Sequence, residues 1–271
     1  MKPSLFLRIF ALTSLLLALV CLSQPTQAAD LPAQIKVIQK RGKLLVGVKQ
    51  DVPNFGYLDP KTETFSGMEV DLAKKIAKEL KVQVQFVPVT AQTRGALVDN
   101  GQIDMAISTF TINPERKKLY HFSTPYYTDA AGFLVNKSSG YQSLKDLNGK
   151  TIGVAQGSNT RSLLLEVAKE HQMSFHFIEL GSYPELSIAL RAHRIDAFSV
   201  DQSILSGFVG KDTRIMDYHF KAADYGIATK KSNKDFSDYL SNLIEAYQKD
   251  GSLQKIYDHY HLKPVTDMKG D

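Results

Sequence analysis

Hydroxyl side chains and one arginine follow a buried apolar segment near the middle of the chain. The hydroxyls belong to Thr109 and Thr111, and the arginine is Arg116. An arginine can donate two parallel hydrogen bonds to a carboxylate, and nearby hydroxyls can complete the shell around it. Ligand-contacting groups also collect just beyond the carboxyl ends of strands in α/β folds. The pattern therefore favours a carboxylate-binding site, although a surface arginine on a proline-initiated helix is consistent with the same residues.

Short β-branched segments alternate with amphipathic helical segments from Lys43 onward. Residues 44–48 have the composition of a buried strand, and apolar residues recur at helical spacing over residues 68–80. A further strand is expected over residues 82–87, before a helix over residues 94–100. This alternation predicts an α/β fold.

The second half of the chain repeats the scheme of the first. Ile103-Asp104 and Ile195-Asp196 each follow a predicted helix and a short turn, and each lies at the start of a predicted buried strand. Two similar lobes are therefore expected.

The chain should cross between these lobes twice, near residues 126–130 and 223–225. The crossovers divide it into one lobe of residues 30–127 plus 224–271 and a second lobe of residues 128–223. A cleft between two hinged lobes is a common place for a small ligand.

Residues 1–29 have the features of a secretory signal peptide. Basic residues precede an apolar run that is too short to span a bilayer, and small residues follow at Ala28 and Ala29. The only cysteine, Cys21, lies in this segment, so cleavage near Ala28 would leave a chain without thiols. Cys21 could instead carry a lipid anchor, although Val20 fits poorly where a small residue is expected. We therefore expect a protein outside the cytoplasmic membrane, either periplasmic or at the cell surface.

The composition argues against nucleic-acid binding and against catalysis. The net charge of +5 is small and dispersed along the chain. The histidines show no metal-ligand spacing, and no Gly-x-Ser-x-Gly motif is present. We therefore expect a monomeric binding protein that uses no metal or cofactor, rather than an enzyme.

Several sequence blocks occur in a fixed order: Gly67-Met68-Glu69-Val70-Asp71-Leu72-Ala73, Asn100-Gly101-Gln102-Ile103-Asp104, residues 111–116, Pro125-Tyr126-Tyr127 and Gly153-Val154-Ala155-Gln156-Gly157-Ser158. Together they resemble the family-3 extracellular solute-binding proteins, which are polar amino-acid receptors of ABC importers. The resemblance covers nearly the whole mature chain and is greatest to the aspartate/glutamate-binding receptors. It departs at Met68, where the family usually has an aromatic or branched residue.

The resemblance implies a type II periplasmic-binding-protein fold, in which two α/β lobes joined by two hinge crossovers close on one amino acid. It also implies that the ligand is delivered to membrane permease subunits of an ABC importer. Arg116, with Thr109 and Thr111, would hold the α-carboxylate of the ligand. Asp201 would hold the α-ammonium group, although a lone aspartate at a strand end is often a turn or cap residue.

A turn in the second lobe would supply further donors to the α-carboxylate. Its residues are Gly157, Ser158, Asn159 and Thr160. The turn opens a predicted helix, whose free amides favour an anion. The same residues also fit an ordinary helix N-cap.

Lys49 and Arg94 indicate an acidic ligand. Lys49 lies just past the first predicted strand, and Arg94 resembles an arginine of the aspartate/glutamate receptors. With Arg116, these cations would match the two carboxylates of a dicarboxylic amino acid. Glutamine would leave Lys49 or Arg94 desolvated without a counter-charge. The alternative is that both are solvated surface cations.

Tyr183 and Tyr225 resemble contacts of the acidic-ligand receptors, or they serve buried packing. Two other functions stay open at this point: a receptor for glutamine or another polar amino acid, and a dehydratase built on the same fold.

Overall fold

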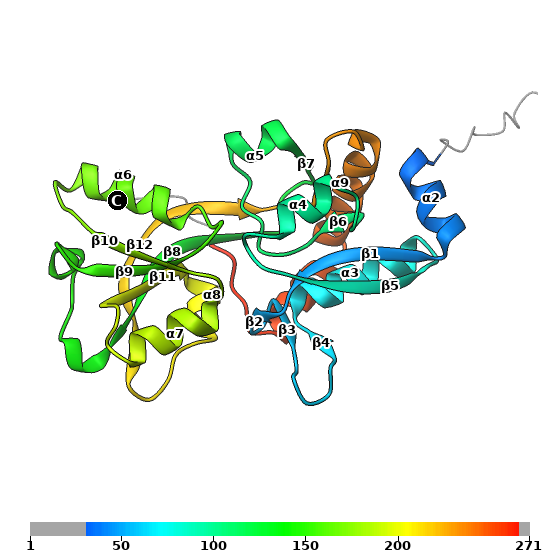
Figure 1. The fold of residues 1–271 in the computed structure, drawn as a ribbon. Coiled ribbons are helices and arrows are strands. Elements are labelled where there is room, and N and C mark those ends of the chain that lie inside the picture. The colour runs from blue at the N-terminus through cyan, green and yellow to red at the C-terminus, as the bar shows by residue number, and fades with distance from the viewer. Residues whose placement is uncertain (1–30, 266–271) are drawn as a thin grey trace, which may run out of the picture. The chain divides into compact units, whose positions relative to one another are not determined.

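The computed structural model describes residues 31–265 (Figure 1). None of the helices in this range is long and apolar enough to cross a membrane. The predicted signal peptide, with Cys21 and Ala28, lies outside the described residues. The signal peptide and the alternative lipid anchor therefore remain predictions.

The first sheet has the strand order β5-β1-β6-β13-β7. The strand β1 is parallel to β5 and β6, whereas β13 is antiparallel to β6 and β7. The strands are β1 (Lys43–Lys49), β5 (Gln83–Val89), β6 (Met105–Ala106), β7 (Tyr120–Phe122) and β13 (Ala228–Lys230). The strand expected over residues 44–48 is confirmed, with Val46 and Val48 buried in the core.

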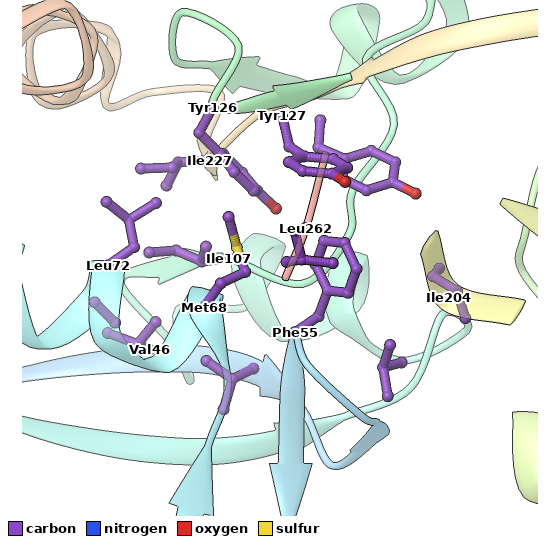
Figure 2. Packing of buried hydrophobic residues seen from close by; sticks show 14 of the residues in the cluster. Val46, Phe55, Met68, Leu72, Ile107, Tyr126, Tyr127, Ile204, Ile227 and Leu262 are labelled. Carbon is purple, nitrogen blue, oxygen red and sulfur yellow. The ribbon is translucent and has the colours of Figure 1, made fainter. Parts of the chain in front are cut away.

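Helices accompany this sheet: α2 (Ala33–Arg41), α3 (Met68–Glu79), α4 (Arg94–Asp99), α5 (Pro114–Leu119), α9 (Lys234–Lys249) and α10 (Ser252–His259). The α3 helix buries Met68, Leu72 and Ile76 on one face, as their helical spacing predicts. Figure 2 shows Met68 and Leu72 in the core with Tyr126 and Ile227. The sequence analysis did not foresee α2, which adds Ile35 and Ile38 to this core.

The second sheet has the strand order β10-β9-β11-β8-β12. The strand β9 is parallel to β10 and β11, and β8 is antiparallel to β11 and β12. The strands are β8 (Tyr127–Asn136), β9 (Thr151–Ala155), β10 (His176–Leu180), β11 (Ala197–Asp201) and β12 (Thr213–Tyr225). The helices are α6 (Thr160–Glu170), α7 (Tyr183–Arg191) and α8 (Gln202–Ser206), with 3-10 turns at η1 (Lys137–Ser139) and η2 (Leu144–Leu147).

A small three-stranded sheet lies between β1 and α3 in the sequence, and the sequence analysis did not predict it. It consists of β2 (Asp51–Val52), β3 (Gly56–Leu58) and β4 (Phe65–Ser66). Gly67 follows it with a φ of 125°, and a Cβ at this position would overlap the carbonyl of Phe55. Only glycine therefore allows α3 to begin directly beside the small sheet.

The two segments expected to cross between the lobes pair with each other. Tyr225 lies opposite Tyr127, and Ala223 lies opposite Asp129, in the antiparallel ladder of β12 and β8. Thr111 adds an isolated bridge to Tyr225. The α/β fold class and the double crossing are as expected. The finer lobe boundaries at residues 127/128 and 223/224 remain a prediction.

Candidate ligand-binding site

The residues named from the sequence gather where strands end and helices begin. Lys49, Asp201 and Tyr225 are the last residues of β1, β11 and β12, respectively. Arg94 and Tyr183 are the first residues of α4 and α7. Groups from both large sheets are thereby brought together, as expected for side chains at the carboxyl ends of strands.

Arg116 lies between the two sheets. Its Nη1 donates to the Thr111 carbonyl at 3.0 Å, and its Nη2 donates to the Gly157 carbonyl at 3.3 Å. The Thr111 hydroxyl in turn donates to Asn159 Oδ1 at 3.3 Å. The residues predicted to bind the ligand carboxylate therefore form one contiguous group, although some belong to the first sheet and others to the turn of the second.

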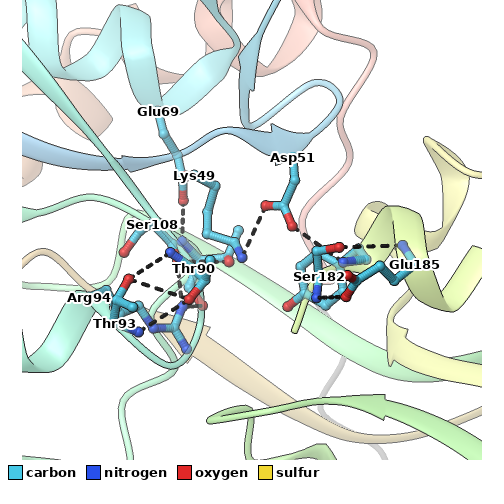
Figure 3. A network of polar contacts seen from close by, with 11 residues as sticks. Lys49, Asp51, Glu69, Thr90, Thr93, Arg94, Ser108, Ser182 and Glu185 are labelled. Carbon is cyan, nitrogen blue, oxygen red and sulfur yellow. Dashed lines mark hydrogen bonds and ion pairs between the residues drawn. The ribbon is translucent and has the colours of Figure 1, made fainter. Parts of the chain in front are cut away.

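Arg94 and Arg116 are stacked on the same aromatic ring. The guanidinium carbons lie 4.2 Å and 4.8 Å, respectively, from the centroid of Phe110. Arg94 is buried, and its Nη1 donates to the carbonyls of Ser108 and Thr109. Figure 3 shows Arg94 beside Ser108 and Thr93.

Neither guanidinium has a carboxylate partner. Among residues 31–265, no ion pair involves Arg94 or Arg116, and Arg94 Nε is buried without a hydrogen-bond acceptor. Burial lowers the pKa of both groups, and the neighbouring Arg94 cation contributes to lowering that of Arg116 to about 9. A guanidinium nevertheless stays protonated in proteins, so both side chains carry a positive charge. The arrangement offers two adjacent cations that no carboxylate contacts directly, although Glu69 acts on Arg94 and Asp201 acts on Arg116 at longer range.

Lys49 differs from its expected state. It is buried, as expected for a ligand-facing residue, but its Nζ lies 3.2 Å from Asp51 Oδ1 and 4.4 Å from the ring centroid of Tyr183 (Figure 3). Burial lowers the pKa of Lys49 to about 8, and Asp51 opposes that shift. The hypothesis that a neutral ligand would leave Lys49 without a counter-charge is therefore wrong, because Asp51 already supplies one. The idea that Lys49 and Arg94 are solvated surface cations is also wrong, since both are buried.

Asp51 is a residue that the sequence analysis missed. Its second oxygen, Oδ2, accepts a hydrogen bond from the backbone nitrogen of Tyr183 at 3.3 Å. Asp51 thus connects β2 to the start of α7 and to Lys49 at the same time. The available signal was an acid two residues after the lysine that ends a buried strand.

Replacing Lys49 alone should destabilise the fold, because Asp51 would be left buried and unpaired. For Lys49→Met we expect a loss of about 3 kcal/mol in the free energy of unfolding, a size typical of a broken buried ion pair. The double variant Lys49→Met/Asp51→Asn should recover most of this loss. Urea denaturation of the three proteins measures both effects. Equal stability of wild type and Lys49→Met would contradict the ion pair.

Glu69 was part of a recognised block, but it was given no role. It is fully buried, and its Oε1 accepts hydrogen bonds from the Tyr126 hydroxyl at 2.6 Å and from the Thr109 backbone nitrogen. Thr109 has a φ of 49°, so Glu69 holds a backbone in the left-handed region next to Arg94. Burial raises the pKa of Glu69 to about 7.

Asp201 and Tyr225, which were both predicted at the site, are hydrogen-bonded to each other. The Tyr225 hydroxyl donates to Asp201 Oδ2. A second carboxylate, that of Asp129, lies nearby and was missed, although an aspartate within the apolar strand β8 was a visible signal. Asp129 accepts hydrogen bonds from the backbone nitrogens of Ala130 at 2.9 Å and Ser203 at 3.0 Å.

The turn before α6 approaches the first sheet closely. Gly157 has a φ of 73°, and a Cβ there would lie 2.5 Å from Gln92 Cα, so the contact requires glycine. Ser158 donates its hydroxyl to the Ala155 carbonyl at 2.7 Å. Asn159 is at the N-cap position, but its side chain makes no capping hydrogen bond and accepts from Thr111 instead. Thr160 is buried at the start of the helix.

Anion recognition is the chemistry that this arrangement supports. The site combines two guanidiniums that have no ion-pair partner, hydroxyl groups and a helix start with carboxylates that could hold an ammonium group. Within residues 31–265, no three histidine, cysteine or acidic side chains are placed to hold a metal ion.

Residues 44–263 match the model of the bacterial extracellular solute-binding proteins, family 3. The chain belongs to this family. It is therefore a solute-binding protein that acts outside the cytoplasm. The predicted type II periplasmic-binding-protein fold, with two α/β lobes, is confirmed.

Relatives within the family are named for different ligands. The chain is 36% identical over 214 residues to a glutamine-binding protein of Geobacillus stearothermophilus, covering 77% of this chain and 80% of that protein. It is 26% identical over 267 residues to an L-glutamate/L-aspartate-binding protein of Pseudomonas aeruginosa, covering 94% and 88%.

A solved structure supports the assignment to a binding protein. It is the ancestral amino acid-binding protein AncCDT-1, a precursor of cyclohexadienyl dehydratase, with a TM-score of 0.76 and 30% identity over 84% of this chain and 99% of that one. This ancestor, like the two relatives, is named for binding rather than for catalysis. The chain is a binding protein and not an enzyme.

Proposed function

We propose that this solute-binding protein captures aspartate or glutamate for an ABC importer. The observation that carries the proposal is the pair of guanidiniums of Arg94 and Arg116. Both lie over the ring of Phe110, and neither forms an ion pair with a carboxylate of the described residues. A dicarboxylic amino acid supplies one carboxylate for each. Among the proteinogenic amino acids, only aspartate and glutamate carry the two carboxylates that neutralise both cations.

The polar groups of the ligand would divide between the two sheets. Its α-carboxylate would bind Arg116, aided by Thr109, Thr111 and the turn of residues 157–160. Its ammonium group would bind Asp201, which Tyr225 orients through a hydrogen bond. Its side-chain carboxylate would bind Arg94, with Lys49 and Tyr183 completing the wall on that side.

Charge separates the acidic ligands from the alternatives. A cationic side chain beside Arg94 would add a further buried positive charge, which is strongly unfavourable. Glutamine would leave Arg94 without a counter-ion, but its amide could still accept a hydrogen bond. Since Asp51 neutralises Lys49, glutamine is disfavoured by one uncompensated cation rather than two. Glutamine is therefore the second candidate, in line with the name of the Geobacillus relative.

The cellular setting follows from the same proposal. The mature chain would act in the periplasm or at the cell surface, released by signal-peptide cleavage near Ala28 or anchored at Cys21. It would bind its ligand as a monomer and dock on permease subunits of the importer.

Thermal unfolding of the mature protein with each proteinogenic L-amino acid tests the ligand class. A ligand at about 100 times its Kd stabilises the folded state by about 2.7 kcal/mol, which raises the Tm by several degrees. L-aspartate and L-glutamate should give the largest increases. A larger increase with L-glutamine, or with L-arginine, would contradict the acidic assignment.

A further inference from the structure

The carboxylates of Asp129, which is buried, and of Asp201, which is half-buried, lie on the same face of adjacent strands. In the antiparallel ladder of β11 and β8, Asp201 is opposite Ala131. Asp129 is two residues before Ala131 on β8, so its side chain points to the same face. The two aspartates are therefore diagonal neighbours, a relation that places residues about 7–8 Å apart.

Tyrosines surround this carboxylate pair on the same face. Tyr127 of β8 and Tyr225 of β12 lie opposite each other in the adjoining ladder, and Tyr225 donates to Asp201. Tyr183 of α7 is also near enough to interact electrostatically with Asp201. No lysine, arginine or histidine in residues 31–265 forms an ion pair with either aspartate.

Two cations act on Asp201 at longer range than an ion pair. Arg94 of α4 and Arg116 of α5 both favour the charged form of Asp201. Asp129 is stabilised by the backbone nitrogens of Ala130 and Ser203 and by the Ser203 side chain, but the negative charge of Asp201 opposes its ionisation.

Burial and mutual repulsion keep a proton on the pair at neutral pH. Burial, followed by repulsion from Asp201, raises the pKa of Asp129 to about 8, and burial also raises the pKa of Asp201. Two neighbouring carboxylates titrate as a unit, so the proton belongs to the pair rather than to one residue.

We propose that the pair formed by Asp129 and Asp201 carries one proton in the ligand-free protein and that the ammonium group of the amino acid displaces it into solution. The inference rests on the proposed function only in requiring an amino acid with a free α-ammonium group, and it is the same for aspartate, glutamate and glutamine. The ammonium binds Asp201 and supplies the positive charge that the proton supplied to the pair in the free protein. Asp129 is then a positioning residue, which couples capture of the ligand to release of a proton.

The coupling makes binding depend on pH with a defined sign. Because the proton is held below a pKa of about 8 and lost on binding, affinity should rise with pH up to that value and level off above it. Release of one proton corresponds to an about tenfold change in Kd per pH unit. Ligand would be held tightly at neutral pH and more weakly in acid.

Calorimetric titration with L-glutamate in phosphate and in Tris buffer at neutral pH counts the protons released. The two buffers differ in ionisation enthalpy, so the difference between the observed binding enthalpies gives the number of protons that the buffer takes up. We expect about one proton for the wild type and close to none for Asp129→Asn. L-glutamine is titrated in parallel, so that the result does not depend on an acidic side chain.

Asp224→Asn is the matched control. Asp224 lies opposite Thr128 in the ladder of β12 and β8. Thr128 directly precedes Asp129 on β8, so the Asp224 side chain points to the opposite face of the sheet from that of Asp129. Asp224→Asn makes the same replacement of a carboxyl by a carboxamide on the opposite face, and it should leave proton release at the wild-type value. Protons exchanged by Glu69 or Lys49 would appear equally in both variants and in the wild type.

The possible outcomes distinguish a failure of the proton-release inference from a failure of the proposed function. Amino-acid binding without proton release by the wild type, or equal release by Asp129→Asn, overturns the inference and leaves the function intact. Absence of binding by any amino acid overturns the function itself. If Asp129→Asn does not fold, the wild-type Kd measured from about pH 6 to about pH 8 decides, because a flat profile contradicts the coupling.

Discussion

Arg116→Ala is expected to abolish measurable amino-acid binding, with a loss of affinity of about 1000-fold or more. The substitution removes a charged, two-pronged donor and leaves the α-carboxylate of the ligand desolvated without a partner. Because every amino acid presents this carboxylate, the loss should be equal for L-glutamate and L-glutamine. Calorimetry with both ligands measures it.

The structure supplies controls for this result. Lys118 lies on the same short helix and is exposed, so Lys118→Ala should bind as the wild type does. Arg116→Lys keeps the charge but loses the planar donor pair, and it should give an intermediate affinity. If Arg116→Ala retained affinity within about tenfold of the wild type, the α-carboxylate would have to bind elsewhere.

Arg94→Gln is expected to change ligand preference rather than binding as a whole. Its loss removes the cation proposed for the side-chain carboxylate, so affinity for L-glutamate should fall by about 100-fold, while affinity for L-glutamine should fall much less. Arg94 also donates to the carbonyls of Ser108 and Thr109, so some general loss is expected. The ratio of the two affinities removes that general effect and is the quantity to compare.

Lys49→Met provides the matched comparison for Arg94→Gln. Both residues are buried cations of the same region, but Lys49 has Asp51 as its counter-ion. The variant should lose stability while it keeps the wild-type preference for glutamate over glutamine. A collapse of this preference in Lys49→Met, with no change in Arg94→Gln, would assign the acidic specificity to Lys49 instead.

Local sequence periodicity was sufficient to predict the elements that bury one continuous face or both faces. The strand around Val46 and the helix from Met68 to Glu79 were found in this way, because burial of their apolar residues follows from spacing alone. The long strand β12 was missed. Its residues alternate irregularly between buried and exposed, and two register shifts against β8 break the period of two. Such a strand is specified by its distant partner rather than by its own pattern.

For the site too, residues in recognisable sequence motifs could be predicted, whereas residues whose roles depend on tertiary contacts could not. Arg116 could be found because it lies in an ordered block of the chain, and Asp201 because it ends the strand that follows Ile195-Asp196. The partners that set their charge balance could not, since Asp51, Glu69 and Asp129 acquire their roles from contacts across the fold. The excess of cations expected from Lys49, Arg94 and Arg116 is therefore reduced by one.

Calorimetric titration of the mature wild-type protein with L-glutamate and L-glutamine, under identical conditions, tests the acidic specificity most directly. Two guanidiniums without counter-ions predict a Kd for L-glutamate at least about tenfold lower than that for L-glutamine. A lower Kd for L-glutamine would contradict the assignment of a side-chain carboxylate to Arg94.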